Sequence, residues 1–140
     1  MDLADALAFA QTSHNGVLVT LKRDGRPQLS NISYAVIDGV IGISITDGRA
    51  KTKNLRRDPR GSLYVSSPDF WSYVVLEGTV ELTPVARALD DDTVEQLVTL
   101  FCAVQNKEHP DWQEYREAMV NDKRLIAWLR PDHAYGFARG

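Results

Sequence analysis

The sequence predicts a mainly β fold, a β-barrel with added helices, and three observations support this. Apolar runs with the pattern of strands recur along the 140 residues. Two Asp-Gly pairs mark tight hairpin turns between the first of these runs. Segments with helical periodicity lie between the later runs. About seven strands, connected mostly by hairpins and with helices inserted, are typical of a barrel.

The first third of the chain predicts one helix and then three strands. Residues 2–10 place Leu and Ala side chains on one helical face. The Asp24-Gly25 and Asp38-Gly39 pairs are the tight turns. Two such turns predict a three-stranded antiparallel meander, with its strands over 17–21, 28–37 and 40–46.

The rest of the chain predicts three helices among four strands. A basic helix is expected to begin at a cap within 46–48 and to end before Pro59. Gly78, inside a long alternating strand, predicts a bulge. The acidic residues 90–92 precede a helix, where acids favour the helix dipole, so we expect a capping cluster rather than a metal site. The other expected elements are strands 61–67 and 72–83, helices 93–105 and 109–120, and strands 125–129 and 133–138.

Composition limits the class of protein. We expect one domain over residues 1–140, and the hydrophobic (44%) and charged (25%) contents are those of a soluble globular protein. Cys102, the only cysteine, lies in an apolar run, so packing is expected and no intramolecular disulfide forms. The chain shows no signal peptide and no apolar stretch of about 20 residues, so we expect a cytoplasmic protein without a membrane partner. Its net charge of -3 argues against a nucleic-acid partner.

The segment from Arg49 to Arg60 departs from this acidic background. It holds six basic side chains and the single acid Asp58, a net charge of +5. Charge runs usually form a solvated helix face, but here almost no acid offsets the repulsion. Arg49 and Lys51 also stand at the start of the helix, where cations oppose the dipole and an anion would relieve them. The pattern therefore predicts an anion site over residues 48–52, suited to phosphate.

Polar residues on neighbouring strands extend this site. Ser44 and Thr46 end the strand before the basic helix, and the preceding strand carries Ser30, Asn31 and Ser33. Hydroxyl and amide groups of this kind can hold the polar edge of a flat heterocycle. Trp71 and Tyr73 can supply aromatic surface. Together these residues predict a cofactor with a phosphate tail and a planar head.

The chain offers little chemistry of its own. It contains neither a P-loop nor a G-x-G-x-x-G motif, and its three histidines are isolated without metal-ligand spacing. No serine or cysteine has the context of a catalytic triad. We therefore expect no metal, leave the catalytic residues unassigned, and expect a cofactor to carry the reaction.

Three stretches carry a resemblance to a known family: GVLVTLKRDGRPQLSNISY, DGRAKTKNLRRDPRGSLYV and WSYVVLEGTVELT. Together they resemble the pyridoxamine 5′-phosphate oxidase superfamily, and more closely its small actinobacterial members that use coenzyme F420. The similarity runs from about Gly16 to the closing HAYGF. It implies a split β-barrel, the FMN-binding split barrel, that forms a homodimer with two cofactor sites at the subunit interface. The C-terminal residues with which the oxidase itself grips pyridoxal phosphate have no counterpart here, which argues against oxidation of pyridoxamine phosphate.

The resemblance also implies roles for individual residues. Arg49 and Lys51 would hold the cofactor phosphate, with the backbone around Ala50. The polar residues Gln28, Ser30, Asn31 and Ser44 would line the ring and its ribityl chain, and Trp71 and Tyr73 would reach the site from the partner subunit.

The function that follows is hydride transfer from reduced F420 to a conjugated small-molecule acceptor of the quinone, tetrapyrrole or unsaturated lactone type. F420 has a long anionic tail, which the surplus cations at Lys53, Arg56, Arg57 and Arg60 can attract. A proton can come from solvent or from Tyr34, although a tyrosine in a strand usually packs. Two alternatives stay open: an FMN-dependent oxidase or reductase of the pyridoxamine phosphate oxidase type, and a non-catalytic protein that binds a cofactor or haem.

Overall fold

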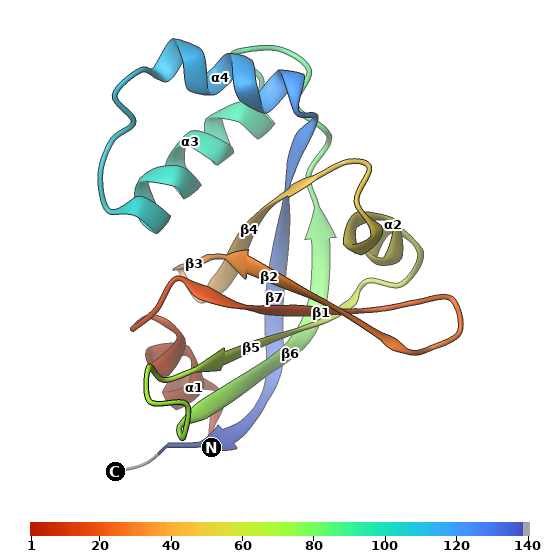
Figure 1. Ribbon diagram of the computed structural model, residues 1–140, viewed down its shortest axis with the longest axis vertical. Coiled ribbons are helices and arrows are strands. Elements are labelled where there is room, and N and C mark those ends of the chain that lie inside the picture. The colour runs from red at the N-terminus through yellow and green to blue at the C-terminus, as the bar shows by residue number, and fades with distance from the viewer. Residues whose placement is uncertain (139–140) are drawn as a thin grey trace.

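The computed structural model describes residues 1–138, which fold into one curled antiparallel sheet with four helices (Figure 1). The seven strands lie in the order β2-β1-β5-β6-β7-β4-β3. Helices α3 and α4 pack together at one end of the sheet and α1 lies at the other (Figure 1). The mainly β prediction is confirmed. The elements are α1 (Leu3–Ala10), β1 (Asn15–Leu21), β2 (Pro27–Ser33), β3 (Ala35–Ile37), β4 (Val40–Thr46), α2 (Ala50–Arg57), β5 (Arg60–Ser66), β6 (Tyr73–Leu82), α3 (Asp92–Gln105), α4 (Trp112–Asn121) and β7 (Arg124–Phe137).

The predicted three-stranded meander is wrong, although both of its turns are present. Asp38 and Gly39 have positive φ angles of 52° and 77°, as a two-residue hairpin requires, and Gly25 has φ 86°. However, the predicted strand 28–37 is divided at Tyr34. Its first part, β2, pairs with β1 at one edge of the sheet, and its second part, β3, pairs with β4 at the other edge. The chain thus joins the two edges of the curled sheet, and β2 comes close to β4.

Tyr34 forms the joint between these two strands. Its side chain is fully buried, and its hydroxyl donates to the carbonyl of Ala10 at 2.5 Å. Its backbone N–H donates to the carbonyl of His14 at 2.8 Å. Burial raises the pKa of Tyr34 to about 12. The hydroxyl is therefore bonded inside the barrel core, as expected of a tyrosine that packs.

The C-terminal strands also differ from the prediction. The expected strands 125–129 and 133–138 are one strand, β7, which continues through Pro131. The bulge predicted at Gly78 is confirmed, since the register between β6 and β7 shifts between Glu77 and Gly78. A Cβ atom at Gly78 would lie only 2.0 Å from the carbonyl oxygen of Arg130. The absence of a side chain at Gly78 therefore allows the two strands to approach at the bulge.

The helix ends show one predicted cap and one unexpected cap. Asp91 caps α3, accepting from the N–H groups of Val94 and Arg87, each at 2.8 Å, so the acidic segment is a capping cluster as predicted. The N-cap of α2 is Arg49 rather than a residue within 46–48, and its side chain makes no capping hydrogen bond. Residues 1–138 contain no group of three side chains that could hold a metal ion.

Two apolar clusters form the core. One fills the curled sheet and includes Leu18, Ile43 and Leu76 together with α1. The other lies between the sheet and the α3–α4 pair and includes Leu97 and Tyr115. Cys102, the single cysteine of the sequence, lies on α3, is half-buried and forms no disulfide. Within residues 1–138, no helix is both long and apolar enough to cross a membrane.

We expect Gly78→Ala to destabilise the protein strongly. The added methyl group would overlap the Arg130 carbonyl, and overpacking of this kind costs about 1–3 kcal/mol or more. Gly48→Ala is the matched control, because no atom lies within 4 Å of a Cβ built there. Urea unfolding of the two variants measures the difference. Equal stabilities would show that the bulge does not depend on glycine.

Candidate functional site

A cavity of about 500 Å³ lies where β2, β4, α2, α3, α4 and the start of β7 meet. One side of the cavity is polar and basic, and the other side is an apolar wall from α3 and α4. The polar lining consists of Asn31, Ser33, Ser44, Thr46, Arg49, Lys51, Gln105 and Arg124. The apolar lining consists of Ile32, Ile45, Leu97, Leu100, Phe101, Val104, Tyr115 and Met119.

Three cations face this cavity from two elements. Arg49 stands at the N-cap of α2 and Lys51 lies in the first turn of that helix. Arg124 begins β7, where it pairs with Thr46 at the end of β4. None of the described residues that line the cavity is Asp or Glu. The positive charge therefore has no compensating acid within the cavity.

The electrostatics of the cavity follow from this arrangement. Burial, followed by the charges of Arg49 and Arg124, holds the pKa of Lys51 below its ordinary value. The Nε atom of Arg124 is buried and has no hydrogen-bond partner in the described structure. The first N–H groups of a helix also lack partners within the helix, so α2 adds donors at the same place. An anion would relieve all three features.

Four of the predicted site residues lie together on this cavity: Asn31, Ser44, Arg49 and Lys51. Gln28 and Ser30 lie elsewhere, in a partly buried polar network. Gln28 donates to the Ser30 hydroxyl at 3.0 Å and accepts from the Thr20 hydroxyl at 3.1 Å. The buried Asn54 of α2 in turn donates to Thr20 at 3.2 Å. The network thus connects β2 and β1 to α2, which places the helix start beside the cavity.

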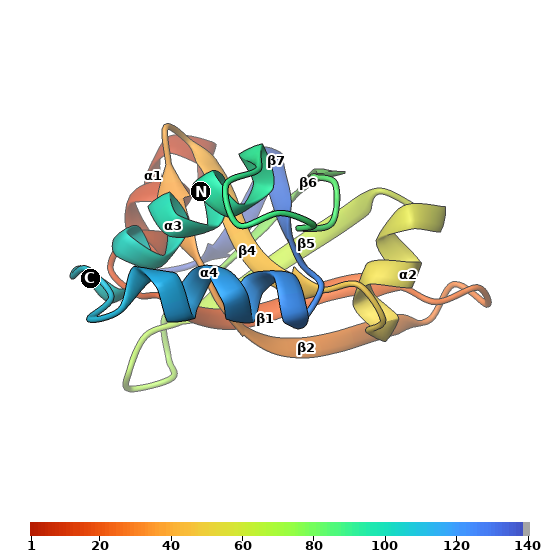
Figure 2. The same cartoon turned by 90° about the horizontal axis from the view of Figure 1, so that it is seen from above.

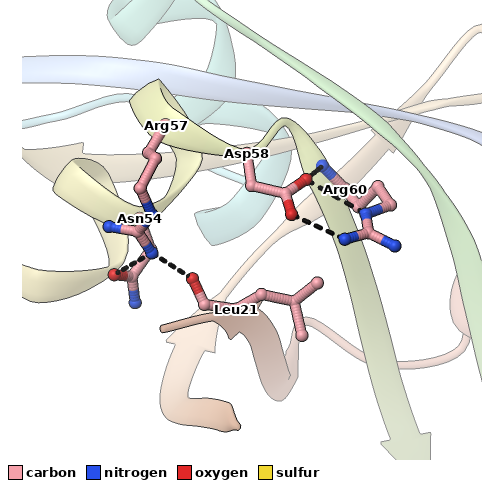
Figure 3. Close-up of polar contacts among 5 residues, drawn as sticks. All are labelled: Leu21, Asn54, Arg57, Asp58 and Arg60. Atoms are coloured by element: carbon pink, nitrogen blue, oxygen red, sulfur yellow. Dashed lines mark hydrogen bonds and ion pairs between the residues drawn. The ribbon is translucent and has the colours of Figure 1, made fainter. Parts of the chain in front are cut away.

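Three arginines in the second half of the basic segment are held by contacts within the chain. Arg57 donates to the carbonyl of Leu21 at 2.5 Å and to Asn54 at 3.1 Å, which ties α2 to β1 (Figure 3). Arg60 bonds the carboxylate of Asp58 through two nitrogens, at 2.7 and 3.1 Å (Figure 3). Arg56 forms an ion pair with Asp47 at 2.6 Å. These three arginines are engaged within the chain, so the expectation that they form a surplus for an anionic tail is not supported.

The other three predicted residues lie outside the cavity. Ala50 is exposed and lines a separate hollow with Lys53 and Arg57. Trp71, whose side chain is 63% exposed, and Tyr73 line another hollow with Tyr64, Phe70 and Phe137. The Tyr64 and Tyr73 rings are stacked at 5.7 Å.

The prediction did not include Arg124 or the wall from α3 and α4. Tyr115 of this wall is buried, and its hydroxyl donates to the Leu97 carbonyl at 2.9 Å. Burial raises the pKa of Tyr115 to about 12. The helical periodicity could have suggested an apolar wall. A single arginine at the start of a strand carries no local signal for a site.

A family model described as pyridoxamine 5′-phosphate oxidase matches residues 4–136 of the chain. Among solved structures, a conserved hypothetical protein from Mycobacterium tuberculosis is similar, at 27% identity and a TM-score of 0.77, over 98% of this chain and 84% of that chain.

Two further similar structures are an F420 reductase and a haem-binding protein. An F420 reductase is 24% identical, with a TM-score of 0.64, over 86% of this chain and 88% of that chain. A haem-binding protein from Mycobacterium smegmatis is 20% identical, with a TM-score of 0.68, over 96% of this chain and 53% of that chain. At these identities the similarity shows the fold alone.

We expect Lys51 to make anion binding pH-dependent. The pKa of Lys51 lies below the ordinary value of 10.5. As the pH rises toward 10.5, Lys51 therefore loses its charge at a lower pH than an exposed lysine does. Sulfate keeps its charge over this range, so the rise in Tm that sulfate causes should shrink. In Lys51→Arg the rise should persist, because arginine stays protonated.

The measurement is thermal unfolding with sulfate and with sodium chloride at equal ionic strength. Without sulfate the sign is opposite: the unfolded chain keeps the Lys51 proton that the folded chain loses, so this residue makes stability increase with pH across the same window. A sulfate effect that declines equally in both proteins would contradict the role of Lys51.

Proposed function

Because the chain belongs to the pyridoxamine 5′-phosphate oxidase family, we propose that it is an oxidoreductase that uses a flavin-type cofactor, coenzyme F420, to reduce a conjugated small-molecule acceptor. The observation that carries the proposal is the cavity itself, in which Arg49, Lys51 and Arg124 face no acid. Polar strand residues and an apolar helical wall complete the lining. This combination suits a ligand with an anionic tail and a planar head.

Arg49 and Lys51 would hold the phosphate. The guanidinium of Arg49 presents a planar fork that matches phosphate oxygens, and Lys51 adds a point charge. The first N–H groups of α2 can donate to the same anion, and the positive end of the helix dipole also lies there.

Asn31, Ser33 and Ser44 would bind the polar edge of the ring, since they lie on the facing ends of β2 and β4. Leu100, Phe101 and Met119 would cover the cavity from the opposite side and exclude water from it. When bound, reduced F420 supplies the hydride. The residues of the chain bind and orient; we assign no catalytic acid or base.

One feature of the surface favours F420 over FMN. Lys53 has no ion pair within residues 1–138, and it borders a hollow whose lining also includes the cations Lys22 and Arg23 and a single acid, Asp24. This hollow lies alongside α2 and would attract the anionic tail that extends beyond the phosphate of F420.

The test is titration of the purified protein with F420, FMN and haemin, followed by single-turnover assays with reduced F420 and a quinone panel. We expect F420 to bind more tightly than FMN. Arg49→Ala should weaken both by about tenfold or more, because a hydrogen bond to a charged group contributes about 1.5–3 kcal/mol. Lys53→Ala is the control on the same helix and should leave FMN binding nearly unchanged.

Each alternative has its own outcome in this experiment. Tighter FMN binding, or protein that is yellow with FMN as isolated, would support the flavin-dependent alternative. Tight haemin binding without F420 binding or turnover would support the haem-binding alternative. Equal cofactor affinities in the wild type, Arg49→Ala and Lys53→Ala would contradict the phosphate site.

We further propose that the protein is a homodimer whose interface includes Trp71 and Tyr73. Leu29 (60% exposed), Phe70 (63%), Trp71 (63%) and Phe137 (58%) are large apolar side chains that face solvent in the single chain. Burial of such residues is favourable, and aromatic residues are enriched in interfaces. Phe70 also has φ 78°, an unusual conformation for a bulky residue.

We expect sedimentation to show a dimer at micromolar concentration and Trp71→Ala to weaken it. Leu89→Ala, which removes another partly exposed apolar side chain outside this cluster, is the control. A monomeric wild-type protein, or equal weakening by the two substitutions, would contradict the proposed interface.

A further inference from the structure

We propose that Arg124 is a third ligand for the anion, so that the cavity selects a group with two negative charges and not a single carboxylate. The inference rests on the proposed function, because it concerns the same cavity. It adds Arg124, which lies far along the chain from the basic segment of residues 49–60. It also names the class of ligand group: a phosphate ester, or a phosphodiester beside a carboxylate.

The charge count is the first reason. One monovalent anion would leave two of the three cations at Arg49, Lys51 and Arg124 unopposed, because none of the described residues that line the cavity is acidic. The three cations also act on one another: burial lowers the pKa of Lys51 most, and the charges of Arg49 and Arg124 lower it further. A doubly charged group would balance the cavity far better.

The unpaired donor is the second reason. Apart from Arg49, the arginines of the basic segment use their guanidinium groups inside the chain: Arg56 bonds Asp47, Arg57 bonds Leu21, and Arg60 bonds Asp58. Arg124 differs, because its Nε is buried without a partner in the described structure. A buried donor on a charged group is costly to leave unpaired, so an anion bound beside Arg124 would offset this cost.

The placement of Arg124 is the third reason. Its carbonyl accepts from the N–H of Ala86 at 2.8 Å, and the preceding carbonyl of Lys123 accepts from Asp47 at 3.0 Å. The residue also pairs with Thr46 across the β4–β7 ladder. Arg124 is therefore presented by a strand that is fixed on two sides, whereas Arg49 is presented by a helix end. Cations held by separate rigid elements are preorganised to grip one group from two directions.

The experiment compares FMN with riboflavin, which has the same ring and no phosphate. We expect Arg124→Ala to weaken FMN binding by about tenfold or more while riboflavin binding stays within about twofold. Arg124→Lys should recover part of the loss, since lysine keeps the charge without the planar fork. Arg130→Ala, on the same strand and with its side chain exposed, is the matched control and should change neither affinity.

A loss of equal size for FMN and riboflavin would overturn the inference, because it would mean that Arg124 supports the cavity without reading the phosphate. Unchanged FMN binding in Arg124→Ala would overturn it as well. Both results are distinct from failure of the proposed function, in which neither F420 nor any flavin binds the wild-type protein.

If no cofactor binds, the rise in Tm caused by sulfate still tests the role of Arg124. Sodium chloride at equal ionic strength is the reference. A rise in the wild type and in Arg130→Ala that is lost in Arg124→Ala supports the inference. No rise in the wild type, or an equal rise in all three proteins, overturns it.

Discussion

The burial of Tyr34 is the constraint on which the cavity depends. Because Tyr34 enters the barrel core and bonds the end of α1, the chain leaves one edge of the sheet at Ser33 and joins the opposite edge at Ala35. This joint brings the end of β2 close to β4. Asn31 and Ser33 from one edge can then share a cavity with Ser44 and Thr46 from the other. In a continuous meander the predicted strand 28–37 would have paired with both β1 and β4 within the sheet. The two edges of the sheet would then not have been joined.

Around this opening, the molecule uses its positive charges in two ways. Viewed from above, α2 lies beside the ends of β1 and β2 (Figure 2). Arg57 and Asn54 fasten it there through Leu21 and Thr20, so the second half of the basic segment stabilises the position of the helix. Arg49 and Lys51, at the start of the segment, line the cavity instead. A charge cluster that looks uniform in the sequence therefore divides into side chains that hold the helix in place and side chains that line the cavity.

The proteins that share this fold include an F420 reductase and a haem-binding protein. Fold alone therefore does not choose a function, and the side chains of the site must do so. In this chain the distinguishing features are three uncompensated cations and an apolar wall from α3 and α4. They favour a ligand that is anionic at one end and planar and apolar at the other.

The sequence by itself determined the local features, because each depends on neighbouring residues. The Asp-Gly turns, the bulge at Gly78, the Asp91 cap and the concentration of charge after β4 all follow from short patterns. The position of Arg49 and Lys51 at the start of a helix could be predicted for the same reason. Only the tertiary structure decided which arginines are free, where β2 and β3 separate, and that Arg124 joins Arg49 across 75 residues of chain. Those outcomes depend on strand pairing between distant segments, and no local pattern records which edge a strand will join.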